Sequence, residues 1–272
     1  MSGGDVRPIG VFDSGMGGLT VLKALRARLP FEDLIYLGDT ARLPYGTKSA
    51  ETVTAYALQA TKLLMAANVK MVVIACNTAS SVALGPLAKA LAPIPVVGVV
   101  EPGARAGVGA TRSGHISVIA TEGTVRGGAY VRAIQALRPD ARVTQCACPL
   151  FVALAEEGWV DGAVTEGAAR RYLDPIFSTR DAPDTLVLGC THFPVLRPVL
   201  SSLLGPDIHL VDSAETTAHA VADILETNGL AKIRGTGRQR FFATDAPDRF
   251  ARLGGIFFDA PIAVRDVELV DL

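Results

Sequence analysis

The stretch MVVIACNTAS, residues 71–80, places a cysteine directly after a short apolar run. The run 71–75 contains the β-branched residues that are typical of a buried strand in a parallel sheet. The small polar residues 77–81 favour the start of a helix. We therefore expect Cys76 to lie where a strand meets a helix N-terminus, whose free N–H groups and dipole would favour the thiolate.

The second half of the chain repeats this arrangement. The apolar run 186–189 precedes Cys190, and a helix-like segment, 195–204, follows. The two cysteines are 190 − 76 = 114 residues apart, and the strand-and-turn units 9–15 and 116–122 are 116 − 9 = 107 residues apart. The similar offsets suggest an internal duplication, with a chance likeness of two strand–helix units as the alternative.

Composition indicates a folded globular protein. The 272 residues can form one large domain or two of ordinary size, and 49% are hydrophobic whereas 19% are charged. A net charge of −1 does not provide the excess of positive charge that binds nucleic acid or an anionic membrane, so we expect neither as a partner.

The first residues of the sequence, its apolar runs and its cysteine spacing indicate the cellular compartment. The first ten residues do not resemble a secretory signal, and no apolar run approaches the roughly 18 residues that span a bilayer. We therefore expect a cytoplasmic protein with reduced cysteines. The cysteines lack the spacing of a structural zinc site, so no metal is expected.

Strands that alternate with helices predict doubly wound parallel sheets. We expect a first α/β domain, 1–98 plus 211–272, that contributes Asp13 and Cys76, and a second, 99–210, that contributes Cys190 and His192. The tail after about residue 211 is expected to pack back on the first domain.

The glycine-rich segment 103–114 could be a helix or a linker. The loop 13–18 is not a dinucleotide-binding GxGxxG, because Thr20 stands where the last glycine would be.

Several cysteine chemistries can be compared by spacing. A Cys-x5-Arg phosphatase loop is excluded, because Val82 and Leu196 stand at the arginine positions. Cysteine acyl transfer with His192 as the base leaves Cys76 without a role. Two thiols from facing domains could instead exchange protons on opposite faces of one carbon, which inverts a stereocentre without a cofactor. Two buried core cysteines are the alternative, and spacing leaves both interpretations open.

Four motifs resemble glutamate racemase of bacterial cell-wall synthesis: FDSGMGGLT at 12–20, YLGDTARLPYG at 36–46, ACNTA at 75–79 and GCTHFP at 189–194. The resemblance runs nearly end to end and includes FFATD at 241–245. It implies two pseudo-symmetric α/β domains with the active site between them. It also implies a cofactor-independent interconversion of L- and D-glutamate that supplies D-glutamate for peptidoglycan.

The same resemblance implies roles for individual residues. Cys76 and Cys190 would be the two acid/bases, the first serving the D-enantiomer and the second the L-enantiomer. Asp13 would assist Cys76, and His192 with Glu156, or with Glu157 in its place, would accompany Cys190. The expected substrate contacts are Ser14, Pro44, Tyr45, Gly46, Asn77, Thr78, Thr121, Thr124 and Thr191.

Other expectations concern assembly and the alternatives. Members of the resembled family dimerise in different ways, so a homodimer or a monomer–dimer equilibrium is expected. Cys146 and Cys148 are expected to be structural. The alternatives are a related two-cysteine racemase for an amino acid such as aspartate, or a binding protein that keeps the cleft without catalysis.

Overall fold

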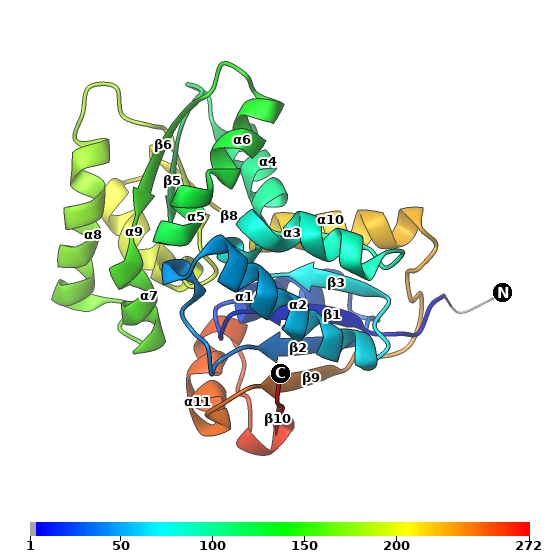
Figure 1. The fold of residues 1–272 in the computed structure, drawn as a ribbon. Coiled ribbons are helices and arrows are strands. Elements are labelled where there is room, and N and C mark those ends of the chain that lie inside the picture. The colour runs from blue at the N-terminus through cyan, green and yellow to red at the C-terminus, as the bar shows by residue number, and fades with distance from the viewer. Residues whose placement is uncertain (1–3) are drawn as a thin grey trace.

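Two parallel β-sheets, each covered by helices, make up the computed structural model, which describes residues 4–272 (Figure 1). The larger sheet has the strand order β10-β9-β2-β1-β3-β4, and the smaller has the order β6-β5-β7-β8. Every pair of neighbouring strands in both sheets is parallel. The α/β fold class with doubly wound parallel sheets is confirmed.

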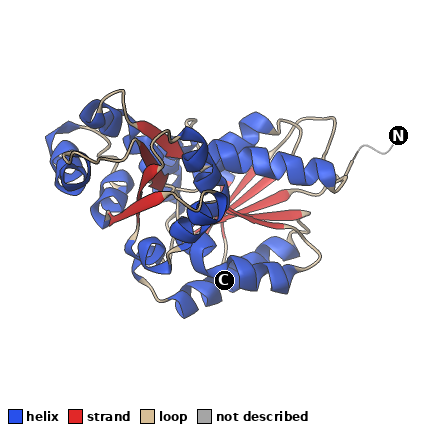
Figure 2. Ribbon diagram, turned by 90° about the horizontal axis from the view of Figure 1, so that it is seen from above, coloured by secondary structure: helices blue, strands red, loops and turns tan. Residues whose placement is uncertain are grey.

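The six-stranded sheet lies between two groups of helices (Figure 2). Alternate side chains of β3 explain this layering, because Met71 and Val73 join one core cluster whereas Val72 and Ile74 join the other. One cluster is completed by α1, α10 and α11, and the other by α2 and α3. The strands are β1 (Ile9–Asp13), β2 (Leu34–Gly38), β3 (Met71–Ile74), β4 (Val96–Gly98), β9 (Gln239–Ala243) and β10 (Val267–Leu269). The helices are α1 (Leu19–Arg28), α2 (Ala50–Ala66), α3 (Asn77–Leu91), α10 (Ala214–Thr227) and α11 (Pro247–Phe258), with the short 3-10 turns η1 (Tyr45–Thr47) and η3 (Val264–Asp266).

The four-stranded sheet is also covered on both faces. Its two clusters are built with α7, α8 and α9 on one face and with α4 and α6 on the other. The strands are β5 (His115–Ala120), β6 (Arg142–Ala147), β7 (Thr185–Gly189) and β8 (His209–Asp212). The helices are α4 (Val100–Ala110), α5 (Glu122–Gly127), α6 (Ala129–Leu137), α7 (Pro149–Glu156), α8 (Gly162–Phe177) and α9 (Arg197–Leu204), with the 3-10 turn η2 (Phe193–Leu196).

Three local features differ from or refine the sequence expectations. The glycine-rich segment 103–114 lies largely in α4, where a Cβ on Gly107 would stand 2.8 Å from a methyl of Val187, so the small residue lets α4 approach β7 closely. The segment between β5 and β6 forms two helices, separated at Gly128, whose φ is 62°. β10 was not expected at all, and it extends the larger sheet beyond β9.

The last part of the chain returns to the larger sheet. β9 pairs with β2, and β10 pairs with β9. β8, in contrast, pairs with β7 and continues to Asp212, so the expected boundary at residue 211 falls inside a strand of the smaller sheet.

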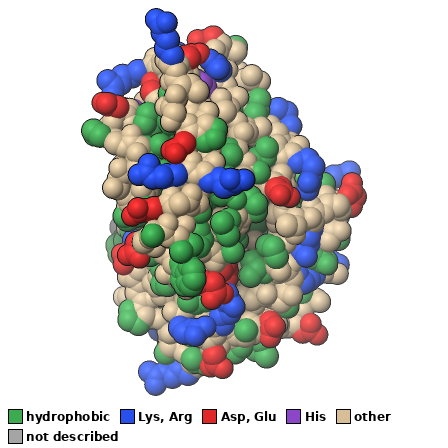
Figure 3. All heavy atoms as spheres, turned by 90° about the vertical axis from the view of Figure 1, so that its left-hand side faces the viewer, with side chains coloured by type: hydrophobic (Ala, Val, Ile, Leu, Met, Phe, Trp, Pro, Cys, Tyr) green, Lys and Arg blue, Asp and Glu red, His purple; other side chains and the backbone are tan. Residues whose placement is uncertain are grey.

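The molecular surface on the side of α7 and α8 has no patch of side chains that all carry the same charge (Figure 3). Figure 3 shows a group of hydrophobic side chains there, surrounded by both acidic and basic ones. The exposed large apolar residues of these two helices and of the segment between them are Leu150, Trp159 and Val164. Among residues 4–272, no helix is both long and apolar enough to cross a membrane.

Candidate active site

Loops from both sheets meet around one small cavity. Cys76 follows β3 and caps α3, and Cys190 directly follows β7, so each thiol stands at the carboxyl end of a parallel strand, where α/β proteins hold ligands. Both cysteines line the cavity, which has a volume of about 20 Å³, room for about one water molecule. Its walls are Ser14, Leu43, Pro44, Tyr45, Gly46, Cys76, Asn77, Thr78, Thr121, Val152, Cys190, Thr191 and His192.

The Cys76 thiol is buried beside a carboxylate. Its Sγ lies 3.3 Å from Oγ of Ser14 and accepts a 3.4 Å hydrogen bond from the Ala79 N–H. Burial and the negative charge of Asp13 raise the pKa of Cys76 to about 12, and the contacts with Ser14 and Ala79 offset only part of that rise. The expectation that the helix N-terminus would favour a Cys76 thiolate is wrong for this reason, so the group is a thiol at neutral pH.

Asp13, at the end of β1, is completely buried next to this thiol. Its Oδ2 accepts hydrogen bonds from the N–H groups of Gly15 and Gly18 and from the Tyr36 hydroxyl, at 3.1, 3.0 and 3.3 Å. Burial raises the pKa of Asp13, although nearby His192 and the backbone donors act in the opposite direction. The carboxyl is therefore held in one place by the glycine-rich loop after β1.

Cys190, His192 and Glu156 are linked in a row by side-chain contacts. Its Sγ is 3.7 Å from Nδ1 of His192, and Nε2 of His192 is 2.6 Å from Oε1 of Glu156, the last residue of α7. Burial alone would lower the pKa of His192, but the contacts with Cys190 and Glu156 outweigh it and raise the pKa well above 6.5. A charged imidazolium therefore stands beside the sulfur of Cys190.

The two glutamates at the end of α7 have separate environments. Glu156 is buried and contacts His192, whereas the Glu157 side chain is 65% exposed and pairs with Arg249 of α11 at 3.3 Å. The geometry therefore places Glu156, and not Glu157, in the row of contacts that ends at Cys190.

Hydroxyl groups form a polar wall that crosses from one sheet to the other. Thr78, at the start of α3, lies 2.9 Å from Thr121 and 3.3 Å from Thr124, and the last two are 3.0 Å apart. Next to this wall, the side-chain amide oxygen of Asn77 accepts a 2.7 Å hydrogen bond from the Tyr130 hydroxyl. Within the described part of the chain the Asn77 amide nitrogen has no partner, which leaves a donor at the cavity.

Two glycines let the loops of the two sheets touch. A Cβ at Gly17 would stand 2.5 Å from Oγ1 of Thr191 and 2.6 Å from Nδ1 of His192. A Cβ at Gly46 would stand 2.6 Å from Cβ of Thr121. These three distances are too short for a Cβ, so both positions require glycine for a close approach.

The sequence-predicted residues fall into two groups. Eleven line the cavity: Ser14, Pro44, Tyr45, Gly46, Cys76, Asn77, Thr78, Thr121, Cys190, Thr191 and His192. The hydroxyl of Tyr45 is turned to Asp39. The other three stand behind the lining: Asp13 acts on Cys76 through its charge, Glu156 contacts His192, and Thr124 contacts Thr78 and Thr121.

Sequence reasoning missed several neighbours of the site. Leu43 and Val152 line the cavity, Asp39 and Tyr130 contact the lining residues Tyr45 and Asn77, and Tyr36 donates to Asp13 behind the lining. A motif match marks residues near the reacting atoms, and Leu43 and Asp39 lie inside the quoted motif 36–46. Val152 and Tyr130 lie in helices with no chemical signal of their own.

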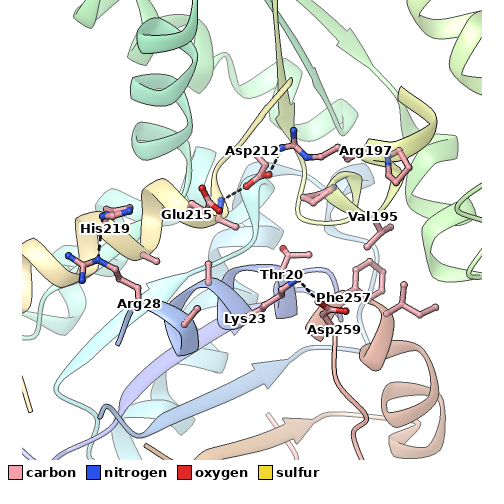
Figure 4. A pocket seen from close by; sticks show the side chains of 17 residues that line it. Thr20, Lys23, Arg28, Val195, Arg197, Asp212, Glu215, His219, Phe257 and Asp259 are labelled. Atoms are coloured by element: carbon pink, nitrogen blue, oxygen red, sulfur yellow. Dashed lines mark hydrogen bonds and ion pairs between the residues drawn. The ribbon is translucent and has the colours of Figure 1, made fainter. Parts of the chain in front are cut away.

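A much larger cavity lies elsewhere in the described chain (Figure 4). It has a volume of about 810 Å³ and lies among α1, α10, the end of α11 and the segment after Cys190. Its charged groups largely pair with one another, as Lys23 does with Asp259 and Arg197 with Asp212. Neither Cys76 nor Cys190 lines it, so the thiol chemistry is confined to the small cavity.

The remaining cysteines lie outside the site. The thiols of Cys146 and Cys148 are 3.8 Å apart, at the end of β6 and before α7. Residues 4–272 contain no group of three His, Cys, Asp or Glu side chains arranged to hold a metal ion.

Comparison with known proteins gives one consistent family. A family model described as Asp/Glu/Hydantoin racemase matches residues 14–221. A glutamate racemase from Geobacter metallireducens is 50% identical over 268 residues, 98% of this chain and 97% of the relative. The crystal structure of glutamate racemase from Francisella tularensis in complex with D-glutamate superposes with a TM-score of 0.90 at 37% identity, with 98% of each chain covered. The structure of the Thermus thermophilus enzyme in complex with beta-chloro-D-alanine gives 0.86 at 45% identity, again with 98% of each chain covered.

Proposed function

Because the chain belongs to the Asp/Glu/Hydantoin racemase family, we propose that it interconverts L- and D-glutamate by two-base proton transfer between Cys76 and Cys190. The observation that carries this proposal is that two thiols line the same cavity, Cys76 after a strand of the larger sheet and Cys190 after a strand of the smaller one. Their charged neighbours differ, because Asp13 lies beside Cys76 and His192 beside Cys190. That arrangement suits a reaction that needs one base and one acid on opposite faces of a carbon.

The protonation states support one direction in detail. Cys190, beside the His192 imidazolium, acts as a thiolate and removes the α-proton of L-glutamate, so that the electron pair of the C–H bond stays on the carbon. Cys76, held as a thiol by burial and Asp13, donates its proton to the opposite face. The product is D-glutamate, with Cys190 protonated and Cys76 ionised. The reverse reaction starts from that form, and proton exchange with water restores the first one.

Polar groups around the cavity fit the charges of glutamate. We assign its two carboxylates to hydroxyl and amide donors, among them Ser14, Thr191 and the free amide nitrogen of Asn77, and to the backbone N–H groups near Gly46. Fixed donors of this kind stabilise the carbanion that forms when a weakly acidic α-proton leaves, because they need no reorganisation at the moment of transfer.

Substrate access requires the two sides of the cavity to separate. A volume of about 20 Å³ accommodates a water molecule and not a glutamate. We propose that the chain forms two domains, 1–98 plus 211–272 and 99–210, with the second boundary displaced past β8, and that they open to admit glutamate and close to exclude water.

The cellular role follows from the product. D-glutamate is the amino acid that the resembled enzymes supply for peptidoglycan, so we place this chain at that step, in the cytoplasm. We propose that it works as a homodimer or in a monomer–dimer equilibrium.

Circular dichroism of glutamate solutions tests the activity. Purified protein without added cofactor should convert either enantiomer of glutamate to a solution with no optical activity, and should act much more slowly on aspartate. Cys76→Ser and Cys190→Ser should each lose racemisation, because a hydroxyl is too weak an acid and base to replace the thiol. Faster turnover of aspartate would make the chain a racemase for that amino acid. Binding of glutamate without turnover would make it a binding protein and overturn the proposal.

A further inference from the structure

Helix α11 contacts both Glu156 and His192. These two residues follow strands of the smaller sheet, whereas α11 lies in the tail that packs against the larger sheet. Arg249 near its start contacts Glu156, and Phe257 near its end contacts His192. From these contacts we infer that α11 is a positioning element for the Cys190 side of the site, with Arg249 as its principal positioning residue. This inference rests on the proposed two-thiol function.

The contacts of Arg249 converge on the end of α7. Its Nη2 donates to the Glu156 backbone carbonyl at 3.2 Å and to Oε1 of Glu157 at 3.3 Å, and lies 3.6 Å from Oε2 of Glu156. The end of a helix carries free carbonyls and partial negative charge. Two glutamates add to that charge, and α7 has no basic residue in its last turn. Arg249 supplies the missing cation from another part of the chain.

Glu156 needs this cation because it is buried. Its side chain is 7% exposed, and one carboxylate oxygen is used by His192. The other oxygen, Oε2, has no hydrogen-bond partner within residues 4–272, and the Arg249 guanidinium is the basic group beside it. A buried carboxylate keeps its charge and its orientation only where nearby donors or cations compensate it.

Phe257 fixes the other member of the pair. Its ring is buried and meets the His192 ring edge to face, with the ring centres 5.4 Å apart and the planes at 79°. The imidazole therefore contacts both the Phe257 ring and the Cys190 thiol. Packing of this kind limits rotation of the imidazole away from Cys190.

The charged and titratable groups around the pair determine what loss of Arg249 would do. They are Asp13 at the end of β1, Tyr36 on β2, Cys190 after β7, Glu157 directly after α7, and Arg249 itself on α11. Arg249 is the only Lys or Arg among them. Its removal takes a positive charge from the neighbourhood, so His192 holds its proton more tightly and the imidazolium beside Cys190 persists to higher pH.

Three variants test the inference. Arg249→Met removes the charge, Arg249→Lys keeps it, and Arg252→Met is the control, because Arg252 is an exposed arginine on the same helix. The Arg249 side chain is 43% exposed, so its effect is screened. We expect Arg249→Met to lower kcat about two- to fivefold with little change in KM, and to move the pH profile of kcat/KM upward by a fraction of a unit. Arg249→Lys should restore most of the profile, and Arg252→Met should match the wild type.

The outcomes separate this inference from the function on which it rests. If wild-type protein does not racemise glutamate, or if Cys190→Ser retains racemisation, the proposed function fails and the role of α11 fails with it. If both hold but the pH profile of Arg249→Met coincides with that of Arg252→Met, the positioning role alone is overturned. A lower melting temperature with an unchanged profile would likewise reduce Arg249 to a purely structural contact.

Discussion

The hydroxyl of Thr78 lies 2.9 Å from the hydroxyl of Thr121, although the two residues follow strands of different sheets. Both groups are buried, and Thr124 completes a triangle of hydroxyls with them. The contact joins the two sides of the site directly, so its strength depends on how closely the loops of the two sheets approach.

Removal of the Thr78 hydroxyl should weaken substrate binding. Thr78→Val keeps the shape of the side chain but leaves Thr121 and Thr124 with one fewer partner at the cavity wall. A lost hydrogen bond of this kind costs about 1–2 kcal/mol, so we expect KM for glutamate to rise about five- to thirtyfold. Thr78→Ser, which keeps the hydroxyl, should stay close to the wild type. Equal KM values for the valine variant and the wild type would contradict this role.

A methyl group at Gly17 should disturb the Cys190 side of the site. Gly17→Ala would place a Cβ 2.5 Å from the Thr191 hydroxyl, which forces the loops apart at a cost of about 1–3 kcal/mol. We expect kcat/KM to fall at least about tenfold. Gly167→Ala is the control, because no atom lies within 4 Å of the added Cβ on this exposed helical glycine, and it should raise stability slightly. Activity assays and thermal unfolding of the two variants distinguish the outcomes, and a fully active Gly17→Ala would contradict the close approach.

The two thiols should differ in reactivity toward iodoacetamide. With a pKa of about 12, only about one Cys76 in ten thousand is ionised at pH 8, whereas a positively charged imidazolium stands beside Cys190. Both side chains are buried at the same cavity, so access affects them alike. Peptide mass spectrometry after brief labelling should find Cys190 modified first, and His192→Gln should slow that labelling. Earlier modification of Cys76 would reverse the assignment of acid and base.

The Glu156–His192 pair should make stability depend on pH. His192 holds its proton more tightly in the folded protein than in the unfolded chain, so its contribution is complete below about pH 6.5 and is lost as pH rises through the higher folded pKa. The wild type should therefore exceed Glu156→Gln in free energy of unfolding most strongly near pH 6. The difference should shrink by at most about 1.4 kcal/mol per pH unit above that. Urea denaturation at several pH values measures it, and parallel curves for the two proteins would contradict a charged pair.

Much of the architecture could be predicted because local patterns determine it. The apolar runs before Cys76 and Cys190 are short, bounded by small polar residues and separated by helical segments, and these signals depend only on neighbouring residues. β10 could not be predicted, since three residues near the end of the chain form a strand only because β9 offers an edge. The segment 103–114 was ambiguous for a similar reason, because Gly107 is explained by its contact with Val187 of β7.

The sequence predicts those site residues that lie in recognisable motifs. It does not predict those whose position depends on packing between distant parts of the chain. Residues in the four motifs, such as Ser14 and Thr191, meet at the cavity. The thiol state of Cys76 was predicted wrongly, because burial and the charge of Asp13 outweigh the helix N-terminus, and neither can be read from neighbouring residues. Arg249 and Phe257 carried no signal, since their role depends on how the tail folds against α7 and His192.

Deuterium incorporation during the first turnovers tests the two-thiol account most directly. L-glutamate is mixed with the protein in D₂O, and the α-hydrogen of each enantiomer is measured by mass spectrometry after chiral separation while conversion is still low. The account predicts that D-glutamate carries deuterium at the α-carbon from the beginning, because Cys76 donates a solvent-derived hydron, whereas unconverted L-glutamate keeps its proton. D-glutamate that retains the original proton would show that one group both removes and returns it, which contradicts the assignment of Cys190 as base and Cys76 as acid.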